Sequence, residues 1–231
     1  KEPFFLLAKS LPVKVWAKHQ NDLLQMEALL FGQAGFLEEK FDDDYPNQLR
    51  KEYLYLKRLH NLEPLHKSVW KFLRLRPSHF PTVRLAQLAA LMNKETKLFS
   101  AFTQLRNIKS LQQLLDVEVS PYWKNHYRFD KSSPKAQTNP GAAMKNILLI
   151  NAVVPVLFAY GKYKGADAYC ERAISLLEKC NPENNSVITG WKKLNVEISN
   201  AGQTQALLQL KGDYCDKFRC LDCAIGVRVL K

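Results

Sequence analysis

The chain has 231 residues, enough to bury a substantial hydrophobic core as one large domain or as two small ones. Hydrophobic residues make up 46% of it and aromatic residues 11%, a composition that excludes an intrinsically disordered chain. The net charge of +12 favours a polyanionic partner, with nucleic acid first and an acidic membrane surface or acidic protein second.

We expect neither a signal peptide nor a membrane span. The most apolar run, ILLINAVVPVLFAY (147–160), is shorter than the roughly 20 residues that a bilayer requires, so we interpret it as a buried core helix. The absence of an initiating methionine indicates a processed or excised piece of a longer protein. Five cysteines cannot form a complete internal disulfide framework, and we therefore expect reduced thiols in a cytoplasmic protein.

Helical periodicity begins clearly in residues 20–37, where side chains recur at three- and four-residue spacing. Gly32 and Gly35 would weaken this helix unless a neighbouring element approaches its backbone closely or the helix ends near residue 35. An acidic loop (38–46) leads to an amphipathic helix over 47–60, with basic residues on its solvent face. The recurring residues of the first helix are Leu23, Glu27, Leu30, Phe31 and Ala34.

The middle of the chain mixes irregular segments with helices. Residues 68–81 alternate leucine with arginine and end between prolines, which predicts extended or irregular chain. Alternating aromatic residues around a polar turn predict a β-hairpin over 117–130. Residues 131–141 have the composition of a linker. Helices are expected at 82–92, 94–105 and 110–116.

The remainder predicts an antiparallel helical bundle, because consecutive helices are joined by short connections. Pro155 is expected to kink the first of these helices. The fold class is therefore all-α, an irregular multi-helix bundle with one short β-hairpin. Residues 1–130 and 142–231 form two subdomains that flank the linker and pack together as one unit. The four helices are expected at about 143–160, 165–179, 182–197 and 201–219.

Five strings in the chain are distinctive when taken together: EALLFGQAGFL (27–37), RLRPSHFPTVRLAQLAAL (74–91), YWKNHYRF (122–129), INAVVPVLFAYG (150–161) and YCDKFRCLDCAIG (214–226). Together they resemble an uncharacterised bacterial family of unknown function, commonest in the Bacteroides group. The resemblance implies that this chain is the C-terminal helical half of a longer protein. It also implies a β-rich N-terminal half with acidic and histidine motifs similar to those of metal-dependent nucleases.

The last of these strings holds Cys215, Cys220 and Cys223 in a C-x4-C-x2-C pattern. Three thiolates could bind zinc or an iron–sulfur cluster if a fourth ligand came from elsewhere, such as Cys170 or Cys180. A reversible disulfide and simple packing of small buried side chains are the alternatives. We expect the three sulfurs to gather at the end of the last long helix, where Lys217 and Arg219 would favour their thiolate forms.

A basic segment between residues 50 and 84 is the second candidate site. Its arginines could hold phosphates in bidentate fashion, while Trp70, Phe72 and Phe80 could stack on bases if they are exposed. Alternatively, the cations form a solvated surface above inward-facing aromatics, or pair with acids such as Glu27 or Asp42–Asp44. The candidate nucleic-acid-binding residues are Arg50, Lys51, Lys57, Arg58, Lys71, Arg74, Arg76 and Arg84.

No catalytic motif is recognisable, and His126 is interpreted as a packed or hydrogen-bonded hairpin residue. We therefore expect a non-catalytic helical module that contacts DNA or RNA and is accessory to a nuclease-like half. The alternative is a structural or protein-interaction domain with no polyanion partner. Salt-dependent binding separates these two functions.

Overall fold

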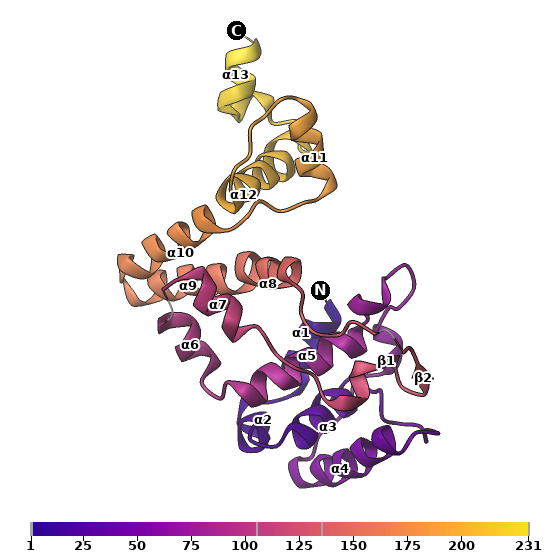
Figure 1. The fold of residues 1–231 in the computed structure, drawn as a ribbon. Helices are drawn as coiled ribbons and strands as arrows, with labels where there is room; N and C mark the ends of the chain where they lie inside the picture. Colours follow the sequence, from indigo (N-terminus) through magenta and orange to yellow (C-terminus); the bar gives the residue numbers. More distant parts are fainter. Residues whose placement is uncertain (1, 105, 135, 231) are drawn as a thin grey trace. The chain divides into compact units, whose positions relative to one another are not determined.

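In the computed structural model, residues 2–104, 106–134 and 136–230 are described. Most of them are α-helical, and the strands among them form a two-stranded antiparallel sheet, which confirms the predicted fold class (Figure 1). The chain divides into two compact units. The first unit comprises Lys1–Ala101 and Leu114–Pro140, and the second comprises Phe102–Gln113 and Gly141–Lys231.

The first unit is organised around α3 (Leu23–Gln33), which is buried from Met26 to its last residue and packs against both α4 and α5. Asp22 begins this helix, its carboxylate accepting from the backbone N–H of Gln25 at 3.2 Å. The other helices of the unit are α1 (Glu2–Ser10), α2 (Val13–His19), α4 (Asp44–His60) and α5 (Pro81–Lys94). Short 3-10 helices lie at Lys67–Val69, Pro77–His79 and Pro121–Lys124.

The two glycines of the predicted 20–37 helix have the explanations that the sequence suggested. At Gly32 the ring of Tyr53 lies against the backbone, and a Cβ there would come within 2.0 Å of the ring. Gly35 lies just beyond the end of α3 with φ of +77°, a left-handed conformation that glycine adopts without strain. Both expectations, a close approach and a helix end, are confirmed.

The hairpin lies later in the chain than predicted. Strand β1 (His126–Arg128) pairs with β2 (Lys131–Ser132), His126 opposite Ser132. The first expected strand is replaced by the 3-10 helix Pro121–Lys124, because proline suits the first turn of a helix and cannot donate to a strand ladder. The predicted linker, 131–141, belongs to the first unit up to Pro140, and its residue Thr138 is buried and donates to the carbonyl of Trp123 at 2.7 Å.

The second unit is also helical. Helices α9 (Val154–Lys164) and α10 (Asp167–Lys179) pack closely where Gly161 faces Cys170. Gly165 adopts a left-handed backbone conformation and ends α9. Short helices α6 (Leu98–Gln104) and α7 (Ile108–Leu114) cross the unit boundaries. The remaining α-helices are α8 (Ala142–Leu148), α9 (Val154–Lys164), α10 (Asp167–Lys179), α11 (Ser186–Lys193), α12 (Ala201–Gln209) and α13 (Ala224–Leu230).

Residues Ala142–Lys164 form one continuous helical stretch that is long and apolar enough to cross a membrane. The core helix of a soluble protein can pass the same test, so this stretch alone does not indicate a membrane protein. Only 28% of its most apolar window is buried, which contradicts the expected buried core helix over 147–160. Ile147, Val156 and Phe158 are exposed. Instead of a simple kink at Pro155, the helix has a π-helical turn over Leu149–Val153, which ends two residues before the proline.

Candidate functional site

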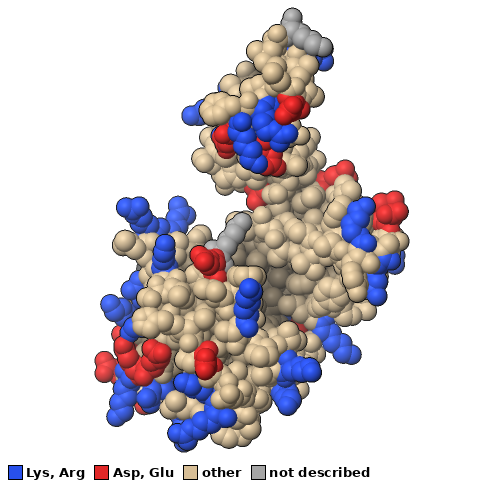
Figure 2. Space-filling model, turned by 180° about the vertical axis from the view of Figure 1, so that it is seen from behind, with Lys and Arg blue, Asp and Glu red and all other residues tan. Residues whose placement is uncertain are grey.

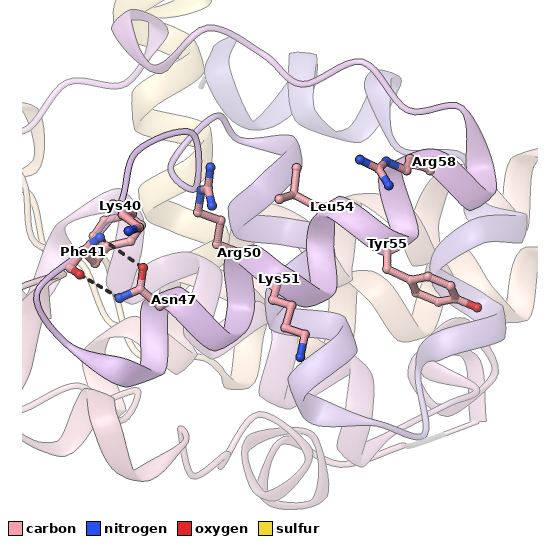
Figure 3. Close-up of a pocket in the computed structure, with 8 residues that line it drawn as sticks. All are labelled: Lys40, Phe41, Asn47, Arg50, Lys51, Leu54, Tyr55 and Arg58. Atoms are coloured by element: carbon pink, nitrogen blue, oxygen red, sulfur yellow. Dashed lines mark hydrogen bonds between the residues drawn. The ribbon is translucent and has the colours of Figure 1, made fainter.

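A groove with a volume of about 630 Å³ runs along the outer face of α4 (Figure 3). Four of its lining residues are cationic, and no described residue that lines it carries a carboxylate. Three of the cations, Arg50, Lys51 and Arg58, are among the residues predicted to bind nucleic acid. The fourth is Lys40, from the loop before the helix, and the remaining lining residues are Phe41, Asn47, Leu54 and Tyr55.

The amphipathic pattern of α4 explains why these cations share one face. Residues Pro46, Leu49, Tyr53 and Leu56 are buried and recur at three- and four-residue spacing. The groove residues that belong to α4 lie on the opposite side of the helix in two rows, and the residues within each row are four positions apart (Figure 3). Arg50, Leu54 and Arg58 form one row, and Lys51 and Tyr55 form the other.

Asn47 fixes the loop end of the groove. Its Nδ2 donates to the carbonyl oxygens of Phe41 at 2.7 Å and Asp43 at 2.9 Å, and its Oδ1 accepts from the N–H of Phe41 at 3.2 Å. The Phe41 ring also packs against Phe129, with ring centroids 5.1 Å apart. These contacts hold Lys40 and Phe41 beside the cations of α4.

We expect Asn47→Ala to lower the free energy of unfolding of the first unit by about 1–2 kcal/mol, because it leaves three backbone hydrogen-bonding groups without this partner. Hydrogen exchange should accelerate at residues 41–43 more than elsewhere in the unit. The matched control is Asn47→Asp, which keeps the acceptor, loses the donors and should lie between the wild type and Asn47→Ala. Unchanged exchange at the loop would show that Asn47 does not hold it.

The electrostatics of the groove favour an anionic ligand. Arg50 is half-buried, and its Nε is shielded from solvent without a hydrogen-bond partner among the described residues. Lys51 and Arg58 are exposed. Leu54 and Tyr55 expose 40% and 59% of their surface, so an apolar strip and an aromatic ring lie between the charges. The groove thus offers sites for phosphate and a ring face for stacking.

The other predicted cations do not line this groove. Lys57 lies on α4, while Lys71, Arg74 and Arg76 are exposed in the segment between α4 and α5, which is irregular as predicted. Arg84 has a structural role, because it is half-buried and donates to the Oε1 of Gln87 at 2.7 Å. Burial lowers the pKa of Arg84 from its ordinary value.

Trp70, Phe72 and Phe80 match the alternative of inward-facing aromatics, because each packs within the first unit. Trp70 is 6% exposed and donates from its indole nitrogen to the carbonyl of Ala34 at 2.8 Å. Phe72 and Phe80 are half-buried, and the guanidinium of Arg128 lies 4.5 Å from the centroid of each ring. Their faces are therefore occupied by a cation from the hairpin.

Glu27 is a buried carboxylate that sequence reasoning did not single out as a site. It is 1% exposed and accepts hydrogen bonds from the hydroxyls of Tyr45 and Ser120, the latter at 3.0 Å. Burial raises the pKa of Glu27 to about 7, and the two hydrogen bonds oppose that rise only in part. The sequence could have indicated this burial, because Glu27 recurs with the apolar residues of the 20–37 helix and so lies on its buried face. The suggested pairing of Glu27 with an arginine is replaced by these two hydroxyls.

His126 has the packed role that the sequence predicted. Its ring stacks on Tyr122 with centroids 3.9 Å apart, and its Nδ1 lies 2.9 Å from the carbonyl oxygen of Tyr122. Tyr122 in turn donates to the Oδ2 of Asp43 at 2.7 Å. The Asp43 carboxylate therefore joins the 3-10 helix that precedes the hairpin to the start of α4.

The three cysteines of residues 214–226 lie in a short irregular segment. Cys215 ends a π-helical turn, and Cys220 begins the 3-10 helix Cys220–Asp222. Cys215 and Cys220 are exposed, whereas Cys223 is buried. Within the described part of the chain, no three histidine, cysteine or acidic side chains are arranged to hold a metal ion. The predicted zinc or iron–sulfur site therefore has no structural support.

The cations next to these cysteines are paired with acids. Lys217 lies 2.8 Å from Asp213, Arg219 lies 3.0 Å from Asp222, and Lys211 pairs with Asp216. The upper part of Figure 2 shows basic and acidic side chains intermingled on this segment. This arrangement differs from that of the α4 groove, where every charged residue of the described lining is a cation.

Comparison with known proteins identifies the family. A family model described as "Protein of unknown function (DUF2851)" matches residues 1–186. No curated protein and no solved structure gave a match. The matched segment contains the α4 groove and Glu27, whereas Cys215, Cys220 and Cys223 lie outside it. The expected resemblance to an uncharacterised family is thereby confirmed, and the chain belongs to this family of proteins of unknown function.

Proposed function

We propose that this chain is a non-catalytic helical module that binds nucleic acid in the α4 groove. The observation that carries the proposal is the convergence of Lys40, Arg50, Lys51 and Arg58 on one groove with no carboxylate in its described lining. Cations that line a groove without a carboxylate attract a phosphate backbone, and displacement of counterions then drives binding. The net charge of +12 adds long-range attraction to the same partner.

The composition of the groove favours single-stranded nucleic acid. Tyr55 is the exposed aromatic residue of its lining, and it lies one helical turn from Lys51. A base can stack on this ring only when it is unpaired, while the neighbouring cations hold the phosphates on either side. Single strands of DNA and RNA both offer this chemistry.

An accessory role beside a nuclease-like half follows from the family resemblance alone. In that arrangement the groove would position a strand for chemistry performed elsewhere in a longer protein. The membership of this chain in a family of unknown function is compatible with the role and assigns no reaction.

The proposal is tested by measuring binding of a fluorescent single-stranded oligonucleotide as salt rises from about 50 to 200 mM. Replacing Arg50, Lys51 and Arg58 together by glutamine should weaken binding about 10- to 100-fold at low salt. It should also reduce the salt slope by about 2, because each lost phosphate contact on a single strand contributes about 0.7. The matched control replaces Lys179, Lys192 and Lys193, which are exposed in the second unit, and removes the same charge.

Equal losses in the two triple variants would show that only net charge matters and would overturn the groove as the site. A third variant, Arg74→Gln with Arg76→Gln, tests the other exposed cations of the basic segment. If that variant alone loses binding, the nucleic-acid site lies between α4 and α5 instead. Salt-independent binding would exclude phosphate contact as the driving interaction.

The alternative function is a structural or protein-interaction domain without a polyanion partner. The exposed apolar residues Ile147, Val156 and Phe158 of the Ala142–Lys164 stretch favour it, because large apolar side chains left exposed on a helix are found in many interaction surfaces. The absence of any oligonucleotide binding at low salt would leave this function as the better assignment.

A further inference from the structure

Two histidines from distant parts of the sequence meet at one edge of the first unit. The Nε2 atoms of His19 and His60 lie 2.8 Å apart, and both side chains are half-buried. Their rings are close to perpendicular, with an interplanar angle of 74°. His19 is the last residue of α2, and His60 is the last residue of α4.

The neighbours of His19 determine which of its nitrogens carries the proton. The Gln25 amide donates from Nε2 to the carboxylate of Glu52 at 2.9 Å, so its Oε1 must face the other way. That Oε1 lies 2.7 Å from the Nδ1 of His19 and can only accept. His19 therefore holds its proton on Nδ1 and presents the lone pair of Nε2 to His60.

This arrangement is that of a metal-ligating histidine. Such a histidine commonly donates its second ring N–H to an oxygen, which fixes the ring and raises the basicity of the ligating nitrogen. Here Gln25 supplies that oxygen, and Glu52 orients Gln25. A chain of three side chains thus holds the His19 lone pair toward His60, where it accepts a hydrogen bond from the His60 Nε2–H and is also oriented to bind a metal ion.

We propose that His19 and His60 bind a divalent transition-metal ion, such as Zn²⁺, through their two Nε2 atoms. Two imidazole nitrogens on one tetrahedral zinc lie about 3.3 Å apart when each bond is about 2.0 Å, so the pair must open by about 0.5 Å. His60 must also move its proton from Nε2 to Nδ1, which exchanges through solvent without a net change in charge. Because both rings are half-buried, water can complete the coordination.

The surrounding charges set the strength of this site. Lys18 is close enough to His60 for its positive charge to act on that imidazole, and this charge repels the ion. The carboxylate of Glu52, which accepts from Gln25, attracts the metal ion instead. The C-terminal end of α4, where the helix dipole is negative, also favours a cation beside His60.

The test is thermal unfolding of the full chain with added ZnCl₂ and with EDTA. Zinc at about 100 times its dissociation constant should raise the melting temperature of the wild type by about 5 °C or more. His19→Gln and His60→Gln should each abolish that rise. Gln25→Leu keeps both ligands but frees the His19 ring, and it should weaken zinc binding about 10- to 100-fold.

Two controls separate this pair from other ligands. His66→Gln removes an exposed histidine of the same unit and should retain the full response to zinc. A variant that combines Cys215→Ser, Cys220→Ser and Cys223→Ser should also leave the response to zinc unchanged. A zinc response that disappears in this cysteine variant but survives in the histidine variants would overturn the proposal, as would no response in the wild type.

A spectroscopic measurement makes the test independent of how the variants fold. Long-range ¹H–¹⁵N spectra of the wild type should show the Nε2 resonances of two histidines shifting together as zinc is added, with the other three histidines unaffected. Shifts confined to other histidines, or to none, would contradict a site at His19 and His60.

Discussion

Replacing Gly32 by alanine is expected to destabilise the first unit by about 3 kcal/mol or more, because the new methyl group has no space. A Cβ at this position would lie 2.0 Å from Cγ of Tyr53 and 2.2 Å from Cδ2. The ring cannot easily move away, since Tyr53 is buried and its hydroxyl donates to the Oε1 of Gln33 at 3.1 Å. Either α3 and α4 must separate or Tyr53 must leave the core.

Urea unfolding followed by tryptophan fluorescence measures this loss. The matched control is Gly190→Ala in α11, where no atom lies within 4 Å of the added Cβ. That substitution should be neutral or stabilise by up to about 1 kcal/mol through helix propensity. If Gly32→Ala were as stable as Gly190→Ala, the close approach of α3 to α4 would be wrong.

The two faces of α4 illustrate what a sequence can predict. Helical periodicity separates Leu49, Tyr53 and Leu56 from Arg50 and its neighbours, so the basic face follows from spacing alone. The groove does not follow from spacing, because one wall belongs to the loop that Asn47 holds through hydrogen bonds to Phe41 and Asp43. Of the eight predicted cations, Arg50, Lys51 and Arg58 line the groove.

The aromatic residues between α4 and α5 could not be oriented from the sequence. Residues 68–80 have no regular period, and without a period no pattern distinguishes an inward ring from an outward one. Trp70 is buried through its contact with Ala34, and Phe72 and Phe80 are covered by Arg128. Both partners are distant in the sequence, so the sequence left base stacking and inward packing open as alternatives.

Long-range pairs explain the other differences. His19 and His60 are 41 residues apart, and Glu27 and Ser120 are 93 residues apart, so their proximity depends on the packing of whole helices. The exposure of Ile147 and Val156 likewise depends on which neighbours cover the Ala142–Lys164 stretch. Local periodicity predicted that this stretch is helical, and it carried no information about its burial.

The stability of the first unit is expected to fall by about 3 kcal/mol as the pH rises from about 4.5 to 8, through the titration of Glu27. Burial raises the pKa of Glu27 from 4.5 to about 7, so between these values the folded state binds a proton that the unfolded state has released. Stability therefore decreases with rising pH in this window and levels off once Glu27 is ionised in both states. At low pH the protonated carboxyl is uncharged, and its burial carries no charge penalty.

Comparing the wild type with Glu27→Gln isolates this effect, because other titrating groups contribute equally to both proteins. Glutamine is neutral at every pH; its amide oxygen can accept a hydrogen bond from one of the two hydroxyls, of Tyr45 and Ser120, and its amide nitrogen can donate to the other. The variant should therefore lack the decrease and become the more stable protein at about pH 8. The control Glu118→Gln removes an exposed carboxylate whose pKa the Lys124 ammonium lowers, so its linkage lies below about pH 4.5 and its profile in this window should follow the wild type. Parallel profiles for the wild type and Glu27→Gln would mean that Glu27 titrates normally, and the buried carboxyl would then have to be ionised throughout the window.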